Sequence, residues 1–130
     1  MTWINDSKAT NVASARVGLE AFEGGVHLIA GGSLKGGGFD GLRDAVAARC
    51  VAVYLIGEAS ERLAADLEPA RVPLERCGEL ERAVAVAGEA ARPGEVVLLS
   101  PACASFDQYE DFEARGAHFR DLAQRWAREG

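Results

Sequence analysis

The chain has 130 residues, of which 48% are apolar and 26% charged, as expected for one soluble globular domain with its own core. Its net charge of −6 disfavours nucleic acid as a partner, and its longest apolar run, residues 50–56, is too short to span a membrane. Three cysteines without a CxxC spacing and two isolated histidines indicate neither a disulfide framework nor a metal site, and we expect a cytoplasmic location.

Strand-like and helix-like segments alternate along the chain. In chain order they predict strand 3–4, helix 12–22, strand 26–30, helix 39–46, strand 51–56, helix 58–67, strand 72–74, helix 80–87, strand 96–99 and a last helix carrying Phe119, Leu122 and Trp126. Gly24-Gly25 ends the first helix, and Pro73 suggests an edge strand. This order predicts an α/β fold over residues 1–130, a single domain with a doubly wound, mostly parallel, Rossmann-like sheet between two helical layers.

Three loops that follow predicted strands carry most of the chemically informative residues. They are residues 5–11, residues 31–38 (the glycine-rich loop) and residues 100–108. In an open parallel sheet, ligands bind beyond the carboxyl ends of the strands. We therefore expect the three loops to meet at one edge of the sheet and to form a site for an anion there.

The first loop, Asp6-Ser7-Lys8-Ala9-Thr10-Asn11, leads from a strand into a helix. A helix N-terminus offers free N–H groups and a partial positive charge, and Lys8 adds a full charge, so the loop suits a phosphate or a carboxylate. The alternative is that Thr10 or Asn11 only caps the helix.

The glycine-rich loop combines closely spaced glycines with one lysine, Lys35. Glycines let backbone approach a ligand closely, although a flexible loop with a surface lysine is the plain alternative. The P-loop pattern fails, since Gly37-Gly38 stands where that motif needs Lys-Ser/Thr. The dinucleotide pattern G-x-G-x-x-G does match at Gly36, Gly38 and Gly41, and Glu58 follows about 20 residues later as a possible ribose ligand. That match begins some five residues after the strand, which is late.

The third loop, Ser100 to Gln108, follows the most apolar strand. Ser105 and Gln108 have capping-box spacing, so Ser105 is predicted to cap a helix, to contact a ligand, or to do both. Cys103 has no histidine near it in sequence, which favours a buried, inert thiol over a nucleophile. The acidic residues of the segment 107–113 favour a helix start and a solvated surface.

Two segments resemble a known family. Residues 5–11 (NDSKATN) and 99–108 (LSPACASFDQ), together with Gly31-Gly32, Lys35 and the segment from Phe112 to Phe119, are similar in order and spacing to the C-terminal domain of the Mur ligases, in the branch that adds D-glutamate to UDP-N-acetylmuramoyl-L-alanine. The resemblance covers essentially the whole chain. It departs from the family at Ser33-Leu34, where an acid and a glycine often precede the lysine.

The resemblance implies an ATP-dependent peptide ligase of peptidoglycan precursor synthesis, in which an acyl phosphate forms and the amine of D-glutamate attacks it. Five residues match the D-glutamate site: Thr10, Lys35, Ser105, Phe106 and Phe112. Asp6 and Lys8 match positions that face the nucleotide. ATP and Mg²⁺ are expected mainly in a central domain that this chain lacks, and UDP-N-acetylmuramoyl-L-alanine in an N-terminal one, so we expect the isolated chain to be inactive. A stand-alone dinucleotide-binding module and a non-catalytic scaffold are the alternatives.

Overall fold

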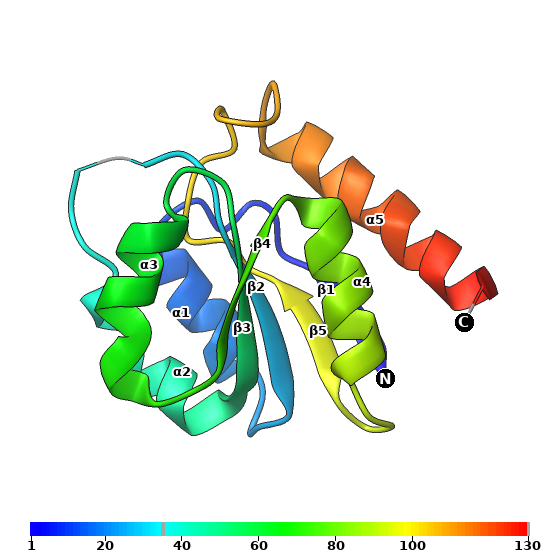
Figure 1. Ribbon diagram of the computed structural model, residues 1–130, viewed down its shortest axis with the longest axis horizontal. Helices are drawn as coiled ribbons and strands as arrows, with labels where there is room; N and C mark the ends of the chain where they lie inside the picture. Colours follow the sequence, from blue (N-terminus) through cyan, green and yellow to red (C-terminus); the bar gives the residue numbers. More distant parts are fainter. Residues whose placement is uncertain (35, 130) are drawn as a thin grey trace.

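The computed structural model describes residues 1–34 and 36–129, and it contains one parallel five-stranded sheet (Figure 1). The strands are β1 (Thr2–Asn5), β2 (Val26–Gly31), β3 (Cys50–Ile56), β4 (Leu74–Gly78) and β5 (Val96–Leu99). Their order in the sheet is β1-β5-β2-β3-β4, and each neighbouring pair is parallel. Strands β5, β2 and β3 therefore lie inside the sheet, and β1 and β4 form its edges.

Helices cover both faces of this sheet. They are α1 (Val12–Glu20), the 3₁₀ turn η1 (Asp40–Leu42), α2 (Arg43–Arg49), α3 (Ser60–Leu67), the 3₁₀ turn η2 (Glu68–Ala70), α4 (Leu80–Ala90) and α5 (Phe112–Glu129). Helices α1, α2 and α3 pack on one face, and α4 and α5 on the other (Figure 1). The predicted three-layer, doubly wound α/β fold is confirmed.

Alternation along the central strands divides the core between the two faces. Successive side chains of a strand point to opposite sides, so Leu28 and Val53 join the cluster under α1–α3, whereas Ile29 and Tyr54 join the cluster under α4 and α5. All six residues of β2 are buried, because this strand is covered on both faces and paired on both edges. Each fully buried large apolar side chain contributes about 1.5–3 kcal/mol.

The fourth strand differs from its prediction. Residues 72–74 were expected to form it, but β4 runs from Leu74 to Gly78 and includes the exposed residues Glu75 and Arg76. An edge strand pairs on one side only, so polar side chains are tolerated there and the apolar pattern fades. Pro73 lies just before the strand, where its carbonyl accepts a hydrogen bond from the Val53 N–H (2.9 Å). The edge position itself is confirmed.

The strand register brings the carboxyl ends to one level. Leu99, which ends β5, pairs with Asn5 of β1 and Ile29 of β2. Ile56, which ends β3, pairs with Gly31 and Gly78. The loops that leave these strand ends therefore share one edge of the sheet.

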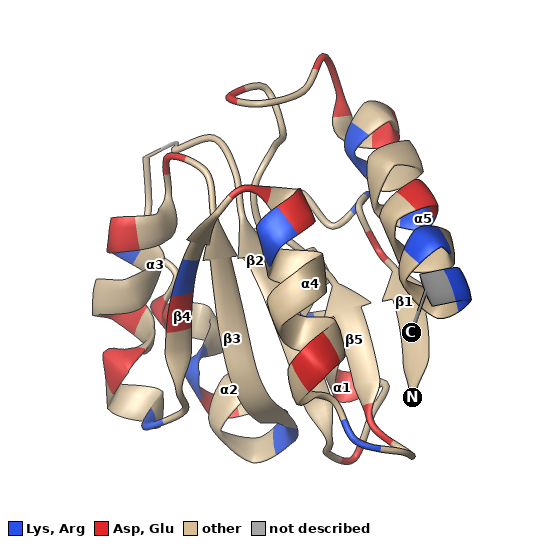
Figure 2. Cartoon of the chain, turned by 45° about the vertical axis from the view of Figure 1, so that its right-hand side comes forward, with Lys and Arg blue, Asp and Glu red and all other residues tan. Residues whose placement is uncertain are grey.

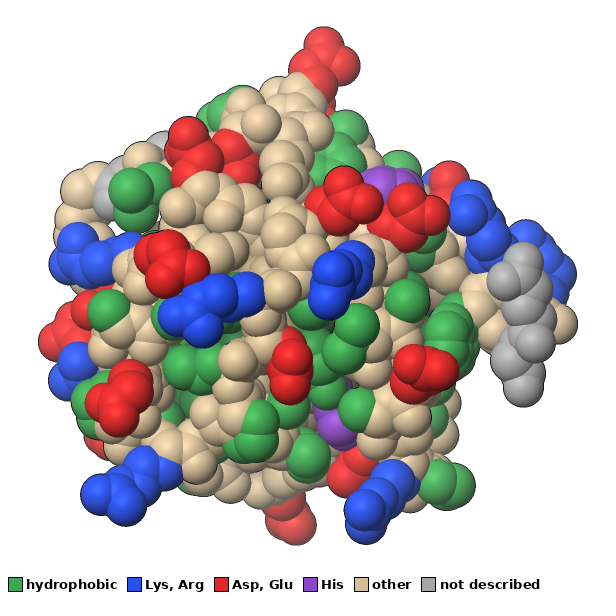
Figure 3. All heavy atoms as spheres, viewed as in Figure 1, with side chains coloured by type: hydrophobic (Ala, Val, Ile, Leu, Met, Phe, Trp, Pro, Cys, Tyr) green, Lys and Arg blue, Asp and Glu red, His purple; other side chains and the backbone are tan. Residues whose placement is uncertain are grey.

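Charged side chains of both signs are spread over the surface. Lys or Arg and Asp or Glu are interspersed along α5 (Figure 2) and over the face that carries α3, β4 and α4 (Figure 3). Within the described part of the chain, no helix combines the length and apolar character that crossing a membrane requires.

Candidate functional site

Backbone hydrogen bonds join the three loops at the carboxyl edge of the sheet. The Ala102 N–H donates to the Ala9 carbonyl (2.9 Å), the Gly31 N–H to the Pro101 carbonyl (3.0 Å), and the Ser33 N–H to Ala104 (2.8 Å). The loop after β5 is thus the central one, bonded to the other two. The convergence expected from the sequence is found.

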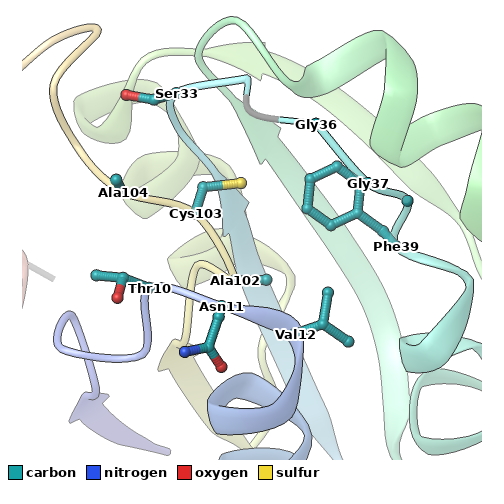
Figure 4. Close-up of a pocket in the computed structure, with 11 residues that line it drawn as sticks. Thr10, Asn11, Val12, Ser33, Gly36, Gly37, Phe39, Ala102, Cys103 and Ala104 are labelled. Carbon is teal, nitrogen blue, oxygen red and sulfur yellow. The ribbon is translucent and has the colours of Figure 1, made fainter.

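A pocket of about 180 Å³ lies where the loops meet (Figure 4). Its lining comes from all three loops and from Phe39: Thr10, Asn11, Val12, Ser33, Gly36, Gly37, Gly38, Phe39, Ala102, Cys103 and Ala104. The Cys103 side chain points into the space between the loop after β5 and Phe39 (Figure 4). Small residues on two sides leave backbone groups accessible to a ligand.

Gly32 permits the close approach of two of these loops. Its φ of +147° lies in a region that L side chains rarely adopt. A Cβ built there would lie 2.2 Å from the Ala104 carbonyl oxygen and 2.9 Å from Cys103 Cβ. Glycine is therefore required for the glycine-rich loop to cross the loop after β5.

Ligand contact and helix capping, the two roles expected for the first loop, belong to different residues. The Asn11 side chain accepts a hydrogen bond from the Ser14 N–H (2.8 Å), so Asn11 is the N-cap of α1. Thr10 is not needed for that bond, and it lines the pocket instead.

Ser105 is buried, with 1% of its surface exposed, and its hydroxyl has no hydrogen-bond partner among the described residues. The capping-box interpretation is wrong. Helix α5 begins only at Phe112, Asp111 accepts from the Ala114 N–H (2.8 Å), and the Gln108 side chain donates to the Gly78 carbonyl (3.0 Å). Because a buried hydroxyl without a partner costs free energy, Ser105 is suited to receive a ligand.

The other described residues of the predicted site do not line this pocket. Phe106 is 66% exposed at the loop surface. Phe112 and the exposed Lys8 line a second cavity of about 320 Å³, together with Arg120. Asp6 accepts a hydrogen bond from the Ser100 hydroxyl (2.8 Å), which turns one carboxylate oxygen toward the protein. The predicted residues are therefore not all in one place: Thr10 lines the first pocket, whereas Lys8 and Phe112 line the second cavity.

Lys35 lies outside the described residues, but its surroundings bear on the dinucleotide alternative. The Glu58 carboxylate accepts a hydrogen bond from the Leu34 N–H (2.9 Å), so it holds the loop rather than standing free for a ribose. Gly41 belongs to η1, and β2 ends at Gly31, well before the G-x-G-x-x-G pattern begins. The tight strand-to-helix turn that this fingerprint needs is absent from the described residues 36–41.

Arg115 is a structural residue of the site that sequence reasoning missed. It is 1% exposed, and its guanidinium donates to the Ser7 hydroxyl (3.0 Å) and the Ser7 carbonyl (2.8 Å). Its Nη1 atom has no hydrogen-bond partner among the described residues, and burial lowers the pKa of the group. A signal existed: Arg115 precedes Phe119 and Leu122 by four and seven residues, so the helical period places it on the buried face of α5.

The thiol of Cys103 is unsuited to nucleophilic chemistry. Burial raises its pKa to about 12, so almost none is thiolate at neutral pH. Across the described residues, no three His, Cys, Asp or Glu side chains come together as a metal-binding group. What the described residues of this edge offer is positioning by backbone groups, hydroxyls and Lys8.

Comparisons with known proteins agree with this geometry. Residues 1–103 match the family described as Mur ligase, glutamate ligase domain. Relatives named UDP-N-acetylmuramoylalanine–D-glutamate ligase are 53% identical in Acidobacterium capsulatum, over 94% of this chain and 26% of the relative. The corresponding values are 51%, 91% and 28% in Sphingopyxis alaskensis, and 46%, 98% and 29% in Pseudomonas fluorescens. The chain thus spans under a third of each of these relatives. Because the family match extends over most of its length, the chain belongs to the Mur ligase family, as a glutamate ligase domain.

Proposed function

We propose that this chain is the C-terminal domain of an ATP-dependent ligase that adds D-glutamate to UDP-N-acetylmuramoyl-L-alanine, and that it receives the D-glutamate. The similarity to relatives bearing that enzyme name supports the reaction. Since those relatives are more than three times as long, the parts that would bind the nucleotide sugar and most of the ATP lie outside this chain. The chain alone is then not expected to ligate anything.

The observation that carries the proposal is the buried, unpartnered hydroxyl of Ser105, the residue that follows Ala104 of the pocket lining. Glutamate brings two carboxylates, each of which needs donors when it leaves water. Ser105 and Thr10 supply hydroxyls from two loops, and the resemblance adds the Lys35 ammonium from the third. Phe106 and Phe112 belong to the proposed glutamate site by the resemblance; neither lines the pocket, and Phe112 lines the second cavity beside Lys8.

Asp6 and Lys8 form the proposed ATP-facing side. Lys8 and Arg120 bring two positive charges to the second cavity and Glu113 one negative charge, which leaves a net positive lining that suits a polyphosphate. One carboxylate oxygen of Asp6 accepts the hydrogen bond from Ser100, and we assign the other oxygen to the ATP-facing side. The resemblance implies that Mg²⁺ is held mainly outside this chain, by the ATP-binding part of the ligase. We further propose a cytoplasmic location, where ATP and the nucleotide-linked substrate are available.

An amide chemical-shift titration of the 130-residue chain with D-glutamate, L-glutamate and NAD tests this proposal. We expect D-glutamate to shift the amides of Thr10, Ser105 and Phe112, even at millimolar affinity, and L-glutamate to shift them less. A Ser105→Ala variant should weaken the response, while an Arg16→Lys variant, at an exposed side chain of α1 that does not line the pocket, should not.

Saturating shifts at Gly36, Gly38 and Glu58 with NAD, and none at Ser105 with D-glutamate, would favour the dinucleotide-binding module instead. Equal responses to D- and L-glutamate would contradict the stereochemical part of the proposal alone.

A further inference from the structure

Two carboxylates on one segment accept hydrogen bonds from the backbone on the two sides of Gly36-Gly37-Gly38, at the near end and the far end of this glycine run. At the near end, the Glu58 side chain accepts a hydrogen bond from the Leu34 N–H (2.9 Å). At the far end, the Asp66 side chain accepts one from the Phe39 N–H (2.8 Å). Glu58 lies just before α3, and Asp66 lies in the last turn of this helix. The two contacts are therefore made from opposite ends of one short helix.

The near end is reinforced from the loop after β5. The Asp107 carboxylate accepts from the Glu58 N–H (3.0 Å), and the Asp107 N–H donates to the Ser33 hydroxyl (3.0 Å). These bonds tie the glycine-rich loop to the segment that carries Ser105.

The far end is held by charge as well as by the backbone bond. The Arg62 guanidinium donates to the same Asp66 oxygen that Phe39 uses (3.0 Å). The Phe39 N–H and, after it, Arg62 lower the pKa of Asp66, so its carboxylate stays ionised at neutral pH. A Cβ at Gly38 would lie 3.0 Å from Arg62 and 3.2 Å from Asp66, so the loop rests directly against this pair.

We propose that Glu58 and Asp66 are positioning residues for glutamate binding, which fix the glycine-rich loop against α3 so that its backbone forms one wall of the pocket. Gly36, Gly37 and Gly38, which lie between the two anchors, line that pocket together with Ser33 and Phe39. Glycines impose little order of their own. Anchoring both ends in advance therefore lowers the entropy that binding would otherwise cost. This inference rests on the proposed function of the pocket.

The closing experiment uses Glu58→Ala and Asp66→Ala, their conservative counterparts Glu58→Gln and Asp66→Asn, and Glu61→Ala as the matched control. Glu61 lies on the same helix, but its 76%-exposed side chain pairs with Arg76 and not with the loop. Amide hydrogen exchange at Leu34 and Phe39 is measured in the 130-residue chain. The KM for D-glutamate, the KM for ATP and kcat are measured in the complete ligase that carries this domain.

We expect each alanine variant to accelerate exchange at its own amide. Each should also raise the KM for D-glutamate about tenfold, the factor that corresponds to about 1.4 kcal/mol, with smaller changes in kcat and in the KM for ATP. The Gln and Asn variants keep an oxygen acceptor and should recover part of the loss, and Glu61→Ala should match the wild type.

Faster exchange with an unchanged KM for D-glutamate would overturn the positioning role while leaving the proposed function intact. If the alanine variants impaired the KM for D-glutamate, the KM for ATP and kcat equally, and Gln or Asn did not rescue them, the two residues would only stabilise the fold. That result would also overturn the positioning role. A wild-type ligase without D-glutamate-dependent turnover would instead refute the proposed function, and the positioning role with it.

Discussion

Arg115 on α5 and Ser7 after β1 are joined by two hydrogen bonds across 108 positions of sequence, from Nε to the Ser7 hydroxyl (3.0 Å) and from Nη2 to the Ser7 carbonyl (2.8 Å). The Ser7 hydroxyl in turn donates to the Phe112 carbonyl at the start of the helix (2.7 Å). Helix α5 thereby sets the conformation of the loop that carries Lys8 and Thr10, although it lies beyond the residues that the family match covers.

Replacing Arg115 by lysine should destabilise the domain by about 1–3 kcal/mol. A lysine ammonium cannot make both hydrogen bonds that the planar guanidinium makes to Ser7, so the buried Ser7 carbonyl would lose its partner. Urea unfolding measures this change. Arg120→Lys, at a 63%-exposed side chain on the same helix, is the control and should stay within about 0.5 kcal/mol of wild type. Equal effects of the two changes would refute the structural role of Arg115.

Gly32→Ala should cost about 2 kcal/mol or more, since it adds backbone strain to a 2.2 Å approach to the Ala104 carbonyl. Gly24→Ala is the matched control, because a Cβ there meets nothing within 4 Å. The midpoints of thermal unfolding compare the two variants. A Gly32→Ala domain as stable as the control would mean that the loops cross less closely than described.

Stability should depend on Glu95 in acid. His27 lies 2.8 Å from the Glu95 carboxylate, and that hydrogen bond, followed by one from the Arg92 N–H, lowers the pKa of Glu95 below its usual 4.5. A carboxyl whose pKa is lowered by folding stabilises the protein above its unfolded pKa, and this contribution disappears as pH falls through its folded pKa. The free energy of unfolding of Glu95→Gln should therefore differ from wild type most at pH 7, and the difference should shrink below pH 4.5.

Glu81→Gln, which changes an exposed acid on α4, provides the control for that pH series. A difference between Glu95→Gln and wild type that stays constant from pH 7 to pH 3 would show that the Glu95 charge contributes nothing.

Cys103 should resist alkylation in the folded chain. Its pKa of about 12, against an ordinary 9.0, lowers the thiolate fraction about a thousandfold, a factor of ten for each pKa unit. Iodoacetamide labelling at pH 8, mapped by mass spectrometry, should modify Cys103 only after unfolding in urea. Rapid labelling of the native chain would contradict the inert assignment.

Much of the fold could be predicted from the sequence because periodicity and turn residues agree along most of the chain. Apolar runs such as residues 51–56 and 96–99 have the pattern of central strands, which are buried on both faces. The prediction failed at β4, where an edge strand carries Glu75 and Arg76 and shows no apolar pattern. The capping-box interpretation of Ser105 also failed, because the S-x-x-Q spacing occurs in a turn that precedes α5.

The site was predictable only in part, for a similar physical reason. Loops that follow parallel strands must share an edge, so their convergence could be expected. Helical spacing gives the burial of Arg115, but the partners of Glu58, Asp66 and Arg115 lie on distant segments, and no local spacing encodes them. Asn11 rather than Thr10 caps α1, a choice that the sequence left open and the Ser14 contact decides.

The most direct test of the central claim is the KM for D-glutamate of the complete ligase carrying Ser105→Ala in this domain. Loss of a hydroxyl that donates to a carboxylate costs about 1.5–3 kcal/mol. We predict that the KM for D-glutamate rises at least about tenfold, while the KM for ATP stays unchanged. An unchanged KM for D-glutamate, or an equal rise in both constants, would contradict the assignment of this pocket to the incoming amino acid.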